Sequence, residues 1–235
     1  PLVSLSDILH NSVAICEEVN KRCRPLEHFT HYLQQGYYPF GAEGFATYNQ
    51  RVENTVELLL NIELPQLRKV DIGNIRKLKA LLSVLASEVP MLVDTAKLST
   101  LLGISRNTLL AYLEYLDEAK LIKRLYSDDL SVKKMQKPDK ILMDNCNLLK
   151  VLALKEPNIG TLRETFFCNQ LGYQHQVEYS KQGDFFIDHQ ITFEIGGQAK
   201  EGKQVAAIED AYIVADDIEY SCGNKLPIWL FGLLY

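Results

Sequence analysis

The stretch GDFFIDHQITFEIGGQAK, residues 183–200, decides the fold of the C-terminal part of this chain. It contains two apolar runs separated by polar residues, and we expect strands over 184–188 and 191–195 that pair as a hairpin. The hairpin would bring together two acids that lie ten residues apart, Asp184 and Glu194. A lysine two residues after such a Glu would complete a known catalytic trio, but this chain carries Gly196 there.

The composition is that of an ordinary globular chain. It has 235 residues, 47% of them apolar and 23% charged, which allows one large domain or two to three small ones. No apolar run approaches the roughly 20 residues that span a bilayer, so we expect no membrane partner. Five cysteines without paired spacing favour reduced thiols and a cytoplasmic location.

The charge is unevenly distributed along the sequence. The formal net charge is −5, which argues against a protein that coats nucleic acid over its whole surface. Residues 119–140 nevertheless hold seven basic and three acidic residues, whereas residues 141–235 hold seven basic and thirteen acidic ones. An anionic partner would therefore bind the middle of the chain, and the C-terminal part would repel it.

Residues 1–72 have the pattern of a helical segment. Apolar residues recur at helical spacing from Leu5 to Cys16, and Ser4 is placed to cap this helix. We expect a second helix over 26–35 and a third that begins near Gly44, with a turn over 36–41 between them.

Residues 73–148 have the element order of a winged helix. A helix that ends before Pro90 and a helix over 94–102 are followed by a turn at Gly103 and a longer helix capped by Ser105. Strands over 121–126 and 140–143 then flank a charged loop. Three helices followed by a hairpin is the order of a winged helix that contains a helix–turn–helix.

This region also carries candidate DNA-binding residues. Three polar residues open the last helix, where base edges are usually contacted: Arg106, Asn107 and Thr108. Three lysines lie in the charged loop, where they could contact phosphates: Lys133, Lys134 and Lys137. Double-stranded DNA is therefore one candidate partner. A protein is the other, because the same helix carries acids toward its end: Glu114, Asp117 and Glu118.

Residues 149–235 have the pattern of an α/β domain. We expect a helix over 161–171 and strands over 175–179, 184–188 and 191–195. A brief helix over 204–209, a strand around Val214 and a buried strand over 228–235 would complete the domain.

Seven pieces of the sequence occur in an order that resembles one large protein family. They are LSDIL, FTHYLQQGYYPF, LSTLLGISRNTLLAYLEYLDEAKLI, KPDKILMDNCNLL, GTLRETFFCNQL, GDFFID and TFEIGG. The chain resembles the C-terminal two-thirds of prokaryotic predicted AAA-type ATPases. In these proteins a nucleotide-binding core precedes a helical segment, a winged helix and a domain of the PD-(D/E)xK nuclease fold. The chain has no phosphate loop ending in Gly-Lys-Ser/Thr. We therefore expect that the ATPase core precedes Pro1 and that ATP is bound only by this core.

The resemblance implies roles for three acids. In the PD-(D/E)xK fold, Mg²⁺ is held by a helix Glu, a strand Asp and a second-strand Glu, which map to Glu164, Asp184 and Glu194. Gly196 supplies neither charge nor donor in place of the catalytic lysine. We expect inherited, structural acids with no ammonium group beside them and no cofactor. A working site with catalytic Asp184, Glu194 and a migrated lysine, Lys200 or Lys203, is the alternative.

The sequence thus predicts a multidomain α+β protein. Its expected parts are a lid-like helical segment over 1–72, a winged helix over 73–148, and a restriction-endonuclease-like PD-(D/E)xK domain with a mixed sheet over 149–235. The expected function is non-catalytic binding of DNA or of a protein partner, including its own ATPase core. A metal-dependent DNA nuclease and a purely structural module are the alternatives.

Overall fold

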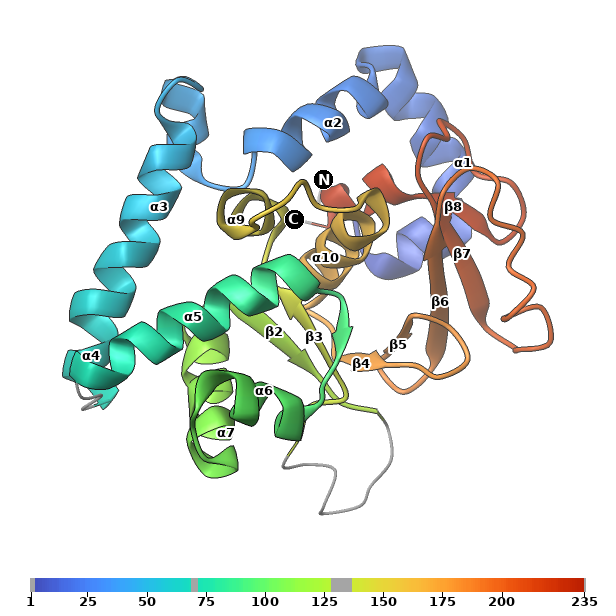
Figure 1. Ribbon diagram of the computed structural model, residues 1–235. Helices are drawn as coiled ribbons and strands as arrows, with labels where there is room; N and C mark the ends of the chain where they lie inside the picture. Colours follow the sequence, from blue (N-terminus) through green and yellow to red (C-terminus); the bar gives the residue numbers. More distant parts are fainter. Residues whose placement is uncertain (1–2, 69–71, 128–136, 235) are drawn as a thin grey trace. The chain divides into compact units, whose positions relative to one another are not determined.

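The computed structural model describes residues 3–68, 72–127 and 137–234 (Figure 1). Its helices and strands form an α+β fold, as expected. Residues 34–158 form one compact unit, the central unit, and residues 1–33 together with 159–235 form a second, the discontinuous unit. The three domains expected from the sequence, over 1–72, 73–148 and 149–235, remain a prediction. Their boundaries differ from those of the two compact units. Within the described residues, no helix is long and apolar enough to cross a bilayer.

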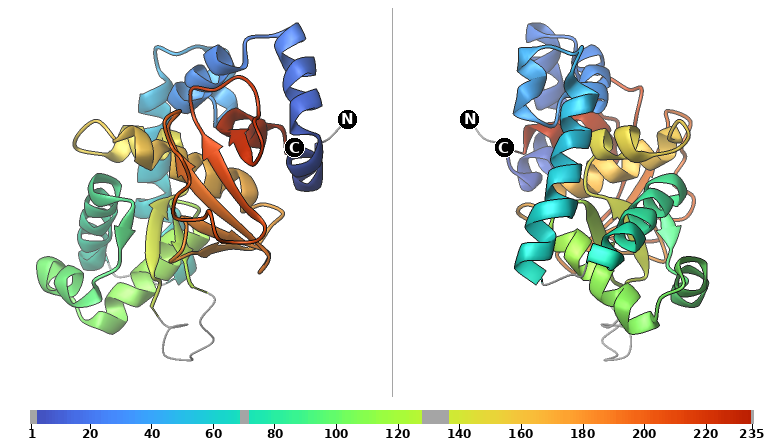
Figure 2. Two further views of the ribbon diagram at one scale, coloured as in Figure 1. Left: turned by 90° about the vertical axis from the view of Figure 1, so that its right-hand side faces the viewer. Right: turned by 60° about the vertical axis from the view of Figure 1, so that its left-hand side comes forward.

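The central unit combines helices with a three-stranded sheet. Its elements are η1 (Pro39–Glu43), α3 (Tyr48–Leu58), η2 (Leu59–Glu63), α4 (Leu64–Arg68), α5 (Ile72–Glu88), β1 (Met91–Leu92), α6 (Thr95–Leu102), α7 (Arg106–Glu118), β2 (Ile122–Leu125), β3 (Lys140–Met143) and α9 (Cys146–Leu152). The strands lie in the order β1-β3-β2, and both pairs are antiparallel. Figure 2 shows α5, α6 and α7 grouped beside this sheet.

Helices α6 and α7 begin and end where the sequence signals them. Asp94 caps α6 by accepting the N–H groups of Ala96 and Lys97, both at 3.0 Å. The helix ends at Gly103, whose φ of +59° lies in the left-handed region that glycine adopts readily. Ser105 then caps α7. Both helices and the turn between them are confirmed. Strand β1 was not predicted, because a strand of two residues is too short to show a periodic pattern.

Leucines on α5 and α7 form the core of the central unit. Six of them are 0% exposed: Leu78, Leu81, Leu85, Leu109, Leu113 and Leu116. They recur every three or four residues, so each helix turns one apolar stripe inward. This stripe packs α5 against β3 and α7 against β2.

A polar cluster ties the segment around Tyr37 to the start of α9. The side-chain oxygen of Asn147 accepts the Tyr37 N–H at 2.8 Å and also the Tyr48 hydroxyl. The Tyr37 hydroxyl donates to the Asp144 carboxylate at 3.4 Å. Asn145 caps α9 by accepting the Asn147 N–H at 3.1 Å. These bonds fix two segments that are far apart in the sequence.

Asp144 is buried inside this cluster, with 7% of its surface exposed. Burial raises the pKa of its carboxyl above the ordinary value of about 3.8, and it outweighs the opposing hydrogen bond from Asn145 and the charges of Lys123 and Lys120. The folded protein therefore keeps a proton on Asp144 at pH values where the unfolded chain has lost it.

Asp144→Asn should remove a pH-dependent loss of stability. From about pH 3.8 up to the raised pKa, the folded state binds more protons than the unfolded state, so the free energy of unfolding falls as pH rises through this window. Asparagine mimics the protonated carboxyl and does not titrate, so the variant should gain stability over the wild type across the window. Urea unfolding at a series of pH values measures this. The control is Glu53→Gln at an exposed site, and parallel pH profiles of Asp144→Asn and the wild type would contradict the prediction.

The discontinuous unit is built on a five-stranded mixed sheet. Its elements are α1 (Leu5–Arg22), most of α2 (Pro25–Gln35), α10 (Ile159–Leu171), β4 (Val177–Tyr179), β5 (Phe185–Ile187), β6 (Ile191–Gly196), β7 (Ala211–Ala215), β8 (Lys225–Pro227) and η3 (Ile228–Leu233). The strands lie in the order β4-β5-β6-β7-β8. The pairs from β4 to β6 are antiparallel and those from β6 to β8 are parallel. The expected mixed sheet is thus confirmed.

Helix α10 packs on one face of this sheet (Figures 1 and 2). The ring of Phe167 lies 5.0 Å from that of Phe193 on β6, 5.4 Å from Phe185 on β5 and 4.8 Å from Phe231 on η3. Side chains alternate between faces along a strand. Because Phe193 faces α10, its neighbour Glu194 faces the opposite side of the sheet.

Three expectations about secondary structure were wrong. Residues 204–209 form turns rather than a helix. Residues 228–233 form the 3₁₀ helix η3 rather than a strand. The sequence could not distinguish the two, because a short apolar run has neither a helical nor a strand periodicity. The third helix begins at Tyr48 rather than near Gly44, which follows the short η1 and has a φ of +127°.

Candidate functional site

Asp184 and Glu194 come from neighbouring segments of the sheet. Asp184 directly precedes β5, and its N–H donates to the Phe193 carbonyl at 2.8 Å, although Phe185 is already the register partner of Phe193. Asp184 and Phe185 thus both lie opposite Phe193, as in a β-bulge. The Asp184 carboxylate accepts the N–H of Ile195, the residue after Glu194, at 2.6 Å. It therefore satisfies a backbone donor of β6.

Glu194 lies on the sheet face opposite α10 and is only 2% exposed. Its register partner in β7 is Ile213, which packs with Val205. The Oε1 atom of Glu194 lies 2.8 Å from the Nζ atom of Lys200. The Oε2 atom is buried and has no hydrogen-bond partner among the described residues. The carboxylate thus has one charged partner and one unsatisfied oxygen.

The expectation that no ammonium group lies beside the acids was wrong, because Lys200 reaches Glu194. Its side-chain stem lies over Gly196: a Cβ atom added there would come within 2.7–2.8 Å of three stem carbons of Lys200. Any larger residue at position 196 would therefore displace the lysine. Lys203, the other lysine considered, pairs with Glu201 at the surface, at 2.7 Å.

Two sets of hydrogen bonds hold the segment that carries Lys200. The N–H of Lys200 donates to the Gly197 carbonyl at 2.9 Å, which closes a turn. The ammonium group of Lys225 on β8 donates to the carbonyls of Gln198 and Lys200, at 2.5 and 3.0 Å. Sequence reasoning missed Lys225, which belongs to no motif and lies 25 residues from Lys200.

Glu164 does not join Asp184 and Glu194. It lies on α10, on the Phe193 side of the sheet, whereas Glu194 lies on the other side. In the part of the chain that the structure describes, no group of three or more His, Cys, Asp or Glu residues is arranged to hold a metal. One oxygen of Glu194 is held by an ammonium group and one of Asp184 by an N–H. As arranged, these residues do not fit Mg²⁺, which needs near-octahedral oxygen ligands.

The candidate DNA-binding residues are partly accessible. Arg106 and Asn107 are exposed at the start of α7, whereas Thr108 is half-buried and its hydroxyl lies 2.8 Å from that of Ser105 in the helix cap. Lys137 is half-buried. The remaining two lysines lie outside the described residues: Lys133 and Lys134.

The outward face of α7 carries two acids toward its C-terminal end, and one of them is covered by an ion pair. Glu114 and Glu118 are exposed on this face. Arg68 of α4 pairs with Glu118, and its guanidinium carbon lies 5.5 Å from the centre of the Tyr115 ring. Sequence reasoning missed this contact, which joins residues 50 positions apart. A side chain of the same unit thus occupies part of the surface that would face DNA.

The sequence comparisons assign the chain to a family. Residues 26–158, more than half of the chain, match the family described as a domain of unknown function, DUF8612. The chain belongs to this family. No curated protein and no solved structure matches it. The family description names no activity, so the function has to be argued from the site.

Gly196→Ala and Lys200→Met should destabilise the protein through the same lost contact. Either change separates the ammonium group from Glu194 and leaves a buried carboxylate without its charged partner, at a cost of about 1–3 kcal/mol. The double variant should cost little more than either single variant, because the contact can be lost only once.

Urea unfolding at neutral pH measures these costs. Lys203→Met, which removes an exposed ion pair, is the matched control and should change the free energy of unfolding by less than about 0.5 kcal/mol. Fully additive costs of the two substitutions at 196 and 200 would show that Lys200 does not depend on the space at Gly196.

Proposed function

We propose that this chain is a non-catalytic binding region of an AAA-type ATPase. The succession of α10, β4, β5, β6 and β7 supports a PD-(D/E)xK-like domain in the discontinuous unit, with Asp184 before β5 and Glu194 on β6. The link to the ATPase rests on the resemblance of the sequence motifs. ATP would be bound by a core that this sequence does not contain.

One observation carries the non-catalytic assignment: the ammonium group of Lys200 lies 2.8 Å from Glu194. It supplies the positive charge that a metal ion supplies in a nuclease of this fold, so the buried carboxylate needs no metal. An ammonium group, unlike a metal ion, offers no coordination position at which water could be activated. Glu194 is also only 2% exposed, so its carboxylate offers little surface to a metal ion from solvent.

We assign the binding role to the central unit. Its element order, α5-β1-α6-α7-β2-β3, and its sheet order, β1-β3-β2, support a winged helix. A protein partner is favoured over DNA because Glu114 is exposed on the outward face of α7 and Arg68 covers Tyr115 and Glu118. Acidic side chains at this place repel phosphates. The ATPase core is the protein partner that the sequence resemblance suggests.

A metal-dependent DNA nuclease is the second candidate, and two observations favour it. The first is the migrated lysine that this alternative requires, since Lys200 lies 2.8 Å from Glu194. The second is an unsatisfied carboxylate oxygen. The Oε2 atom of Glu194 is buried without a hydrogen-bond partner among the described residues, and a cation would satisfy it. Such an enzyme would use Glu164, Asp184, Glu194 and the migrated Lys200, so Glu164 would have to move to the other acids.

Incubation with plasmid DNA in the presence of Mg²⁺ or Mn²⁺ distinguishes the two candidates. We expect no cleavage above that of an Asp184→Ala variant, and no heat of binding when either metal is titrated into the protein. The Asp184→Ala variant controls for contaminating nucleases. Cleavage by the wild type that this variant lacks would establish the nuclease and refute the proposal.

The preference for a protein partner is tested by DNA binding. Fluorescence anisotropy with labelled double-stranded DNA at low salt should give equally weak signals for the wild type and for Arg106→Ala. Lys155→Ala, which removes an exposed lysine outside α7, controls for the loss of one positive charge. Salt-sensitive binding that weakens selectively in Arg106→Ala would instead assign α7 to DNA.

A further inference from the structure

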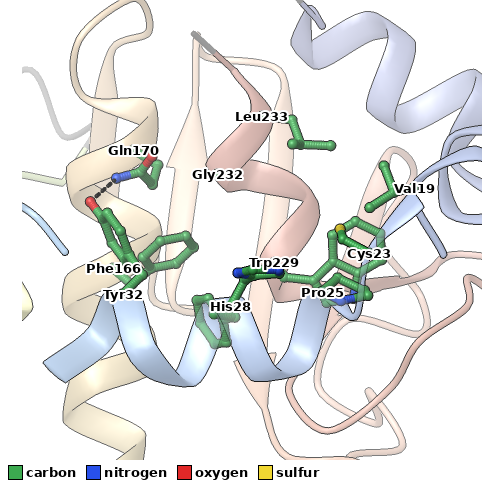
Figure 3. Close-up of a pocket in the computed structure, with 11 residues that line it drawn as sticks. Val19, Cys23, Pro25, His28, Tyr32, Phe166, Gln170, Trp229, Gly232 and Leu233 are labelled. Carbon is green, nitrogen blue, oxygen red and sulfur yellow. Dashed lines mark hydrogen bonds between the residues drawn. The ribbon is translucent and has the colours of Figure 1, made fainter. Parts of the chain in front are cut away.

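A pocket of about 220 Å³ lies within the discontinuous unit (Figure 3). Its walls are aromatic side chains of α2, α10 and η3: Phe29, Tyr32, Phe166 and Trp229. Among the described residues that line it, none is Asp, Glu, Lys or Arg. The pocket therefore offers mainly apolar and aromatic carbon atoms, together with His28 and Cys23, and no carboxylate, ammonium or guanidinium group.

Hydrogen bonds and ring contacts hold the aromatic walls in place. The indole Nε1–H of Trp229 donates to the Ile218 carbonyl at 3.1 Å, and the amide of Gln170 donates to the Tyr32 hydroxyl at 3.1 Å, the bond drawn in Figure 3. The rings of Tyr32 and Phe166 meet edge to face at 5.7 Å. These bonds and contacts fix the rings, and Phe29, Phe166 and Trp229 expose 6%, 3% and 5% of their surface. Little side-chain ordering is therefore needed when a ligand binds.

The volume of the pocket fits one or two rings. An engineered apolar cavity of about 150 Å³ in another protein stays dry and binds benzene. A volume of about 220 Å³ therefore accommodates a substituted benzene or two fused rings. A pocket without carboxylate, ammonium or guanidinium groups disfavours charged ligands, since their desolvation would be poorly compensated.

The surroundings of the pocket favour a small molecule over a protein side chain. A docked protein needs a wider apolar interface around the inserted ring. In the described parts of the chain, none of the large apolar side chains that are strongly exposed lines this pocket. We propose that the pocket binds an uncharged small molecule that carries a one- or two-ring aromatic group.

Trp229 makes the proposal directly measurable, because it is the only tryptophan in the chain. Toluene serves as the probe, since it does not absorb where tryptophan is selectively excited. We expect a saturable change in Trp229 emission as toluene is added. Benzoate carries the same ring with a negative charge and should bind more weakly, because the pocket does not compensate the desolvation of its carboxylate. Equal or tighter binding of benzoate would overturn the proposal.

Gly232 at the rim of the pocket provides the blocking variant. Its φ lies outside the left-handed region, and a Cβ atom there would lie 3.5 Å from the Phe166 ring, an ordinary contact. Gly232→Leu should weaken toluene binding at least about ten-fold. Glu17→Leu, which adds the same side chain at an exposed site of α1 away from the pocket, should leave it unchanged.

Circular dichroism verifies the fold of both variants. If Gly232→Leu does not fold, Gly232→Ala takes its place, with a smaller but measurable loss of affinity expected. Absence of any toluene-dependent change in Trp229 emission would overturn the proposal. Equal affinities of the wild type and the Gly232 variant would do the same.

Discussion

The ion pair between Lys200 and Glu194 is the constraint on which the account of this site depends. A carboxylate that is 2% exposed in the middle of a sheet needs a positive charge beside it. The chain meets this need with the Lys200 ammonium group at 2.8 Å. Gly196 leaves room for the lysine stem, and Lys225 holds the backbone of the segment that carries it. Two nearby residues, Gly196 and Lys200, and the more distant Lys225 thus serve one buried charge.

The same sheet separates two environments. On one face, aromatic rings of α10, β5, β6 and η3 pack together around Phe167. On the other face, Glu194 is enclosed by its lysine and by apolar neighbours of Ile213. Asp184 lies at the bulge of the sheet, where its carboxylate accepts the backbone N–H of Ile195 in place of a backbone carbonyl. Both acids therefore have structural partners, which supports the proposed non-catalytic role.

Local signals in the sequence predicted local structure well. Asp94, Gly103 and Ser105 marked helix boundaries that the structure confirms, because caps act within three or four residues. The two apolar runs around Asp184 and Glu194 predicted the hairpin correctly. The side-chain partners of the site were not predictable in the same way. Lys200 crosses over Gly196 after a turn, and Arg68 contacts α7 from 50 residues away, so neither contact has a periodic signature. The 3₁₀ helix η3 was taken for a strand because its residues are apolar throughout.

A crystal structure of the protein soaked with Mn²⁺, with anomalous scattering data, tests the central claim most directly. If Lys200 has taken the place of the metal, its ammonium group will remain against Glu194 and no anomalous peak will lie within about 3 Å of either carboxylate oxygen. A manganese peak coordinated by Glu194 and Asp184, with the lysine side chain turned away, would contradict the account.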